Sequence, residues 1–154
     1  MFNIGSLSYH IGEEDRHHGY YAVGYALGSS PSETSADKTF NYALWTLIEQ
    51  PLLHVGESHL GAMWQGGTSP ASRSTCRHYW GAGLIWSNIP PRMTQVGLVV
   101  NRALYADGRE TDVELTGSFP VCNHFTLQPA VHCINTNGNY TAAAQLRAIL
   151  EFGN

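Results

Sequence analysis

The chain has 154 residues, which fits a single domain over residues 1–154, long enough to bury a sizeable core without disulfides or metals. Charged residues make up 13% of the sequence, against about 25% in an ordinary soluble domain. The formal net charge is −4 and no basic stripe is present, which excludes nucleic acid from the expected partners. So few charges indicate a surface that is either covered by small polar residues or buried against neighbouring copies, and we favour burial.

The N-terminal segment lacks the basic start, apolar run and small-residue cleavage site of a signal peptide, so we expect synthesis in the cytoplasm without such a signal. Uninterrupted apolar runs of about 18 residues are also missing, and we therefore expect no membrane partner. The 3 cysteines form no CxxC pair and predict free, buried thiols.

The first predicted strands are residues 2–10 and 18–28. In the second, the large Tyr21, Val23 and Tyr25 alternate with small residues, which predicts that the bulky side packs inward and the small side lies close to another layer.

Residues 39–49 are ambiguous between helix and strand. Their apolar spacing fits an amphipathic helix with Ser35 as its cap. Their aromatic and β-branched content, with Pro51 closing the run, fits a strand. We favour the strand, and we expect two more strands at residues 58–67 and 76–87.

Two hairpins are predicted in the second half of the chain. Asp107-Gly108 separates strands at 94–105 and 109–119, and Asn137-Gly138 separates the strands that precede and follow it. Both dipeptides tolerate the positive φ of tight type I′ turns. Between the hairpins, residues 121–129 predict a further strand.

These elements predict an all-β fold with little helix. About eight to ten short strands separated by turn signals are typical of a single antiparallel β-sandwich, jelly-roll-like in character. Because seven consecutive positions of the last strand, residues 140–152, match a period of two, we prefer a strand there over an Ala-rich helix.

The 8 histidines make a metal site one possibility to consider. If residues 121–134 folded back around Gln128-Pro129, they would bring together two pairs of potential ligands: His124 with His132, or Cys122 with Cys133. This spacing matches no standard zinc finger or ribbon, and we predict no metal and no cofactor. His17-His18 and His54 with His59 carry still weaker signals, since they form no HExxH motif.

Catalytic motifs are not found. The sequence has no GxSxG elbow and no Gly-rich phosphate loop with its lysine, and Cys76 near His78 is explained by two side chains sharing a sheet face. We therefore expect a protein that is not an enzyme.

Aromatic and small residues suggest contact surfaces instead. Tyr and Trp are enriched at interfaces and on sugar-binding surfaces, and a face of small residues lets another layer approach closely. The candidates for an interface or for sugar stacking are Tyr79, Trp80, Trp86, Ala142, Ala144 and Ala148.

The function expected from the sequence is structural. We expect an assembly protein that associates with copies of itself or with other subunits, in the form of a virion component such as a phage capsid decoration, adaptor or tail protein. The first alternative is a lectin-like carbohydrate-binding module that binds a glycan through exposed Trp and Tyr. The second is a small metal-dependent β-barrel enzyme that uses the histidines.

Overall fold

The computed structural model describes residues 2–11, 19–31, 38–70, 75–89 and 93–150. These residues form nine antiparallel strands in one sheet, and each strand pairs with its neighbours in the sequence, in the order β1-β2-β3-β4-β5-β6-β7-β8-β9. The strands are β1 (Phe2–Ile11), β2 (Gly19–Pro31), β3 (Lys38–Val55), β4 (Ser58–Thr68), β5 (Cys76–Ile89), β6 (Met93–Tyr105), β7 (Arg109–Cys122), β8 (Phe125–Thr136) and β9 (Asn139–Leu150).

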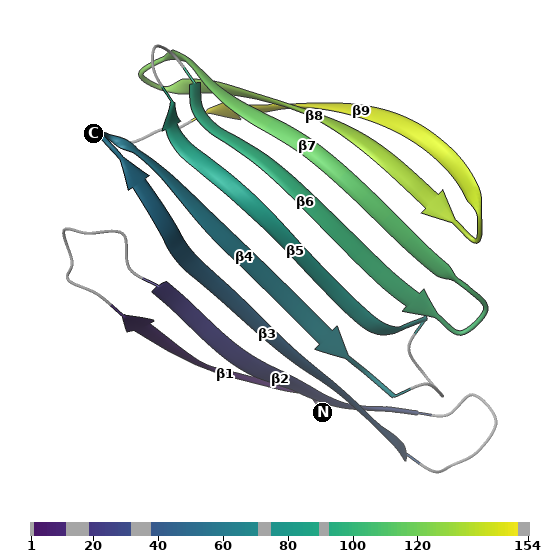
Figure 1. The fold of residues 1–154 in the computed structure, drawn as a ribbon. Coiled ribbons are helices and arrows are strands. Elements are labelled where there is room, and N and C mark those ends of the chain that lie inside the picture. The colour runs from purple at the N-terminus through teal and green to yellow at the C-terminus, as the bar shows by residue number, and fades with distance from the viewer. Residues whose placement is uncertain (1, 12–18, 32–37, 71–74, 90–92, 151–154) are drawn as a thin grey trace.

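The predicted all-β antiparallel class is confirmed, and the number of strands falls in the predicted range. Figure 1 shows the strands side by side in a single curved layer, with β1 and β9 at its two edges. The described residues contain one sheet rather than the two packed sheets of a sandwich, and they contain no helix that could cross a membrane.

Residues 39–49 are strand, as favoured from the sequence, but two strand ends differ from the prediction. Pro51 does not close β3, which continues to Val55 through a register shift between Pro51 and Leu53. The shift accommodates a proline that cannot donate to the ladder.

The turn between β7 and β8 is also not where the sequence suggested. Residues 121–129 are not one strand: the chain turns at residues 123 and 124, where Cys122 pairs with Phe125. Pro129 lies inside β8, opposite Leu146 of β9. The pairing of β8 with β7 passes from Ala130 directly to Leu127, so the missing N–H of Pro129 falls where that ladder is interrupted.

The two turn dipeptides behave differently. Asn137 and Gly138 have φ of 54° and 96°, as predicted for a tight hairpin turn. Positive φ does not occur at Asp107 or Gly108; instead Tyr105 N donates to Gly108 O at 2.8 Å across a turn of three residues. The prediction of a hairpin at this position is confirmed, and the prediction of its turn type is wrong.

The sheet has two chemically different faces. Residues directly opposite each other in an antiparallel pair share a face, and faces alternate along a strand. We call the face that contains Val23, Leu84 and Leu98 the apolar face, and the face that contains Asn101 and Asp112 the polar face. All carboxylates within the described strands lie on the polar face: Glu49, Glu110, Asp112 and Glu114.

A conventional hydrophobic core does not form among the described residues. The buried hydrophobic side chains there are Ala22 and Ala130, both on the polar face, at 3% and 6% exposure. The prediction that the bulky side of β2 packs inward is wrong, because Val23 is 55% exposed while its neighbour Ala22 is buried. In a single layer, the large side chains of the apolar face have no second sheet to pack against.

Candidate functional site

The apolar face carries aromatic side chains at both ends of an aliphatic stretch. On β5, Trp80 and Trp86 flank Ala82 and Leu84, and all four share this face. Both tryptophans and Leu84 are exposed. On β2, Tyr21 and Tyr25 flank Val23 in the same way. The face is therefore apolar in the middle of these strands and amphipathic, through the indole N–H and phenol O–H groups, toward their ends.

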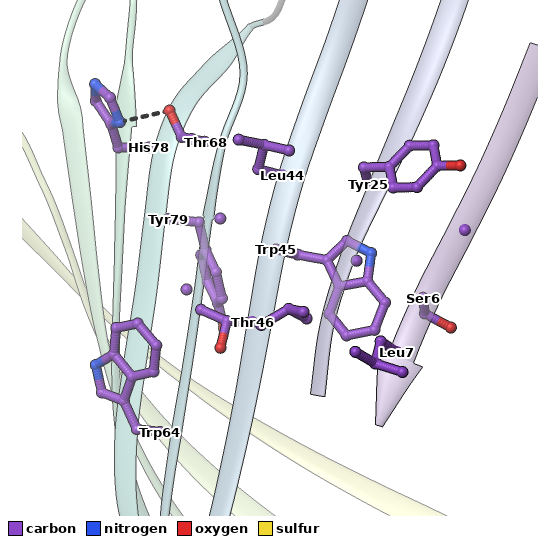
Figure 2. Close-up of a pocket in the computed structure, with 15 residues that line it drawn as sticks. Ser6, Leu7, Tyr25, Leu44, Trp45, Thr46, Trp64, Thr68, His78 and Tyr79 are labelled. Carbon is purple, nitrogen blue, oxygen red and sulfur yellow. Dashed lines mark hydrogen bonds between the residues drawn. The ribbon is translucent and has the colours of Figure 1, made fainter. Parts of the chain in front are cut away.

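A hollow of about 870 Å³ lies over β1 to β5 and is lined mainly by side chains of the apolar face. Figure 2 shows Leu7, Tyr25, Leu44 and Trp64 around it, with a hydrogen bond of 3.0 Å between Thr68 Oγ1 and His78 Nδ1 at one end. The side chains that line the hollow are mainly apolar and aromatic, so the hollow presents a surface for apolar contact.

The polar face holds a hydrogen-bonded triad across three strands. Gln65 Nε2 of β4 donates to Tyr79 OH of β5 at 2.5 Å, and Tyr79 OH donates to Asn101 Oδ1 of β6 at 2.7 Å. Gln65 Nε2 also lies 3.4 Å from Asn101 Oδ1. The three side chains are partly buried, and their mutual hydrogen bonds fix their positions along the polar face.

Gly81 makes the space for this triad. It lies directly opposite Gln65 on one side and Asn101 on the other. A Cβ at this position would collide with Asn101 Oδ1 and lie 3.1 Å from Gln65 Nε2. The glycine is therefore required for the close approach of two polar side chains, not for a special backbone conformation.

An ionic cluster continues the polar face onto β7 and β8. Asp112 lies opposite Asn101, and its Oδ2 is 3.0 Å from His132 Nδ1. The hydrogen bond to Asp112 is the main cause that raises the pKa of His132 above its ordinary value; partial desolvation opposes the shift, and the charges of Asp112 and Glu114 add to it. Hydrogen bonding to Gln145 of β9 contributes in the same direction. We call Gln65, Tyr79, Asn101, Asp112 and His132 the polar band.

Tyr79 is held in its neutral form. Burial is the largest cause that raises the pKa of its phenol, and the negative charge of Asp112 is the next. The neutral phenol keeps the proton that it donates to Asn101. The polar band thus presents amide, phenol, carboxylate and imidazole groups on adjacent strands.

The metal candidates of the sequence are not brought together as one set. The turn at residues 123 and 124 places Cys122 and His124 at the end of the β7–β8 hairpin. His132 lies opposite Glu114 on the polar face, whereas Cys133 lies opposite Val113 on the apolar face. Pairing His124 with His132, or Cys122 with Cys133, would need a turn at Gln128-Pro129, but β8 is continuous there.

The interface candidates separate by face. Trp80 and Trp86 lie on the apolar face, and Tyr79 lies on the polar face within the triad. On the edge strand β9, Ala142, Ala144 and Ala148 are all exposed on the apolar face.

The remaining histidine and cysteine candidates lie apart. Cys76 Sγ donates to the backbone oxygen of His78 at 3.4 Å, while the ring of His78 contacts Thr68. His54 and His59 pair across the β3–β4 hairpin with their rings stacked, 6.1 Å between centroids. His17 and His18 lie outside the described residues.

The sequence motifs do not single out Gln65, Asn101 and Asp112 of the polar band, nor Glu114 beside it. One signal was available: Asp112, Glu114 and Thr116 alternate with apolar residues on β7 and predict a polar face. The signal does not reveal which residues of the neighbouring strands lie beside Asp112, because these follow only from the strand order together with the register of each pair.

Comparison with known proteins identified no relative: no family model matches the chain, and no curated protein or solved structure is similar to it. The function is therefore argued from the two faces and the edges of the sheet.

Proposed function

We propose that this sheet is embedded in a lipid bilayer, with its apolar face against the acyl chains and its polar face lining a water-filled passage for small polar solutes. The observation that carries the proposal is the separation of the faces: most of the exposed large apolar side chains lie on one, with Phe2, Ile4 and Trp45 as exceptions, and the strand carboxylates lie on the other. Such alternation over strands joined in sequence order is the pattern of a membrane-spanning antiparallel sheet.

The strand lengths support this placement. A tilted strand needs about 9–11 residues to cross the hydrocarbon core. The shortest strand, β1, has 10 residues and the longest, β3, has 18. Each strand is therefore long enough to cross a bilayer.

The positions of the aromatic residues independently support placement in a bilayer. Trp and Tyr concentrate at the two membrane–water interfaces, where the ring contacts lipid and the polar atom reaches water. Trp80 and Trp86 flank the aliphatic Ala82 and Leu84 of β5, as expected for a strand that crosses both interfaces. A water-exposed surface would gain nothing from this order along the strand.

The two edge strands of the sheet would need pairing partners in a bilayer. β1 and β9 are edge strands, and unpaired backbone groups are costly in hydrocarbon. We infer that further strands pair with both edges and complete a ring, supplied by other copies of this chain or by additional residues of a longer one. In this form, the association with copies or other subunits expected from the sequence occurs edge to edge.

The polar face suggests the solutes. Its carboxylates Glu49, Glu110, Asp112 and Glu114 outnumber the guanidinium groups of Arg77 and Arg147, so the passage would favour cations over anions. The amide and phenol groups of the polar band would exchange hydrogen bonds with neutral polar solutes.

The four tryptophans provide the test. Trp64, Trp80 and Trp86 lie on the apolar face, and Trp45 lies on the polar face. Single-tryptophan variants, with the others changed to Phe, would be reconstituted into vesicles that contain brominated lipid. We expect strong quenching of the three apolar-face tryptophans and weak quenching of Trp45. Equal quenching at all four positions, or failure of the folded chain to enter vesicles, would contradict the proposal.

A second candidate follows from the same exposed apolar face. Two copies could pack these faces together in water and form a sandwich, consistent with the low charge content and with a structural role in a larger particle such as a virion. This candidate predicts a stable oligomer in detergent-free buffer whose tryptophans are not quenched by lipid, so the same variants separate the two.

A further inference from the structure

We propose that Asp112, Glu114 and His132 form a binding site for a divalent transition-metal cation, with Zn²⁺ as its probe. One ligand atom from each side chain can be chosen so that all three lie within 4.8 Å of one another. The site differs from the metal candidates of the sequence, since it uses His132 with two carboxylates in place of His124 and the cysteines.

The strand register creates the cluster. Asp112 and Glu114 are two residues apart on β7 and therefore share the polar face, and His132 of β8 lies directly opposite Glu114. Three donors thus come from adjacent positions on two hydrogen-bonded strands. Strand positions hold ligands more rigidly than loops, and small rotations of the side chains close the distances to those of a metal site.

The chemistry of the donors suits the cation. Imidazole nitrogen and carboxylate oxygen are both ligands of Zn²⁺, which binds them at about 2.0–2.2 Å. Imidazole favours transition metals over Mg²⁺ and Ca²⁺, which prefer all-oxygen sites. Gln145 of β9, which interacts with His132, would orient the ring from the next strand.

An unsatisfied atom points to a missing partner. Asp112 Oδ2 contacts His132, but Asp112 Oδ1 is inaccessible to solvent and has no hydrogen-bond partner in the described part of the chain. A buried carboxylate oxygen without a partner is costly. A cation held between the Asp112 and Glu114 carboxylates would satisfy it and would relieve the repulsion of two like charges on one strand face.

The test is a calorimetric titration of the folded chain with Zn²⁺ at about pH 8, an alkaline pH chosen because protons compete with the metal for the imidazole. We expect one site per chain, and a reduction in affinity of about tenfold or more for each of D112N, E114Q and H132A. These conservative changes lie on the partly exposed polar face, and circular dichroism verifies that each variant folds.

Two matched controls use the same hairpin. E110Q removes a carboxylate from the same face of β7, and H124A removes the imidazole of the β7–β8 turn; both should bind Zn²⁺ like the parent chain. Binding that survives H132A, or that is lost in H124A or on replacing Cys122 and Cys133 with Ser, would overturn the proposal. The titration does not depend on placement in a membrane, so its outcome is separate from that of the proposed function.

Discussion

Gly81 of β5 lies directly opposite Asn101 of β6, and the missing side chain of the glycine leaves the space that the Asn101 amide occupies. The triad of Gln65, Tyr79 and Asn101 depends on this relationship, since both amides converge over the glycine. The arrangement of the polar side chains therefore depends on the small size of Gly81 as well as on the hydrogen bonds between them.

Replacement of Gly81 by valine should break the triad. The new side chain would collide with Asn101 and crowd Gln65, and overpacking of this kind costs about 1–3 kcal/mol. Chemical denaturation of the two proteins measures the loss of unfolding free energy. The control is Ala82→Val, one residue along on the apolar face, which should change the unfolding free energy far less. Equal losses for the two variants would contradict this account.

Tyr79 should ionise at a higher pH than an ordinary tyrosine. Burial and the charge of Asp112 raise the pKa of its phenol, so the folded state favours the neutral form. The resulting stabilisation is fully present below the ordinary pKa of about 10 and is lost as the pH rises through the higher pKa of the folded protein. Ultraviolet absorbance during alkaline titration follows the ionisation.

Two variants are needed to assign the titration step to Tyr79, because the pKa of Tyr105 is also raised, first by burial and then by the charge of Glu110. The titration step lost in Tyr79→Phe but kept in Tyr105→Phe belongs to Tyr79. D112N should then lower the pKa of Tyr79, and an unchanged value would exclude Asp112 as a cause.

A lysine introduced on the apolar face should destabilise the protein in a bilayer far more than a lysine introduced on the polar face. Leu98, which is 48% exposed, lies on the apolar face, and its neighbour Val99 lies on the polar face opposite Glu114. We expect Leu98→Lys to destabilise the reconstituted protein by about 2–4 kcal/mol, the cost of a cation near the bilayer midplane. Val99→Lys should be tolerated better because Glu114 and water solvate it. The same cost for both, measured by urea unfolding from vesicles, would argue against a lipid-facing apolar surface.

Gly24 and Trp45 should be energetically coupled. The indole lies over the buried glycine on the neighbouring strand, where a Cβ would collide with the ring. Gly24→Ala should therefore displace Trp45, shift its fluorescence and cost about 1–3 kcal/mol. Trp45→Leu in the Gly24→Ala background should recover part of the loss. Additive effects of the two changes in a double-mutant cycle would show that the residues are not coupled.

Much of the fold was predictable because strand periodicity is local. The alternation in residues 109–119 predicts a strand with one polar face, and Asn137-Gly138 predicts the turn between β8 and β9. Pro51 and Pro129 misled the prediction of strand ends, since each sits where the pairing is irregular or interrupted. Periodicity shows that two faces exist and does not show what covers the apolar one.

The candidate site was less predictable. The polar band joins residues from five strands, and it requires both the strand order and the register of each pair. The sequence singles out His132, but it does not reveal that Asp112 and Glu114 lie beside it, because the register between β7 and β8 is not encoded locally. A strand of alternating character contains few consecutive apolar residues, so the length of apolar runs does not tell whether such a sheet contacts lipid.

The sheet order has a consequence for how the width of the structure can change. Within the described ranges, each strand contacts only the strands adjacent to it in the sequence, so these strands form a row of hairpin units with no strand inserted between distant segments. Removing or duplicating one hairpin, such as β6 with β7, would shorten or lengthen the row by two strands and leave every other pairing and the assignment of both faces intact. The architecture therefore separates the chemistry of the two faces from the width of the sheet, and gain or loss of hairpins offers a simple route by which such a sheet can change its width.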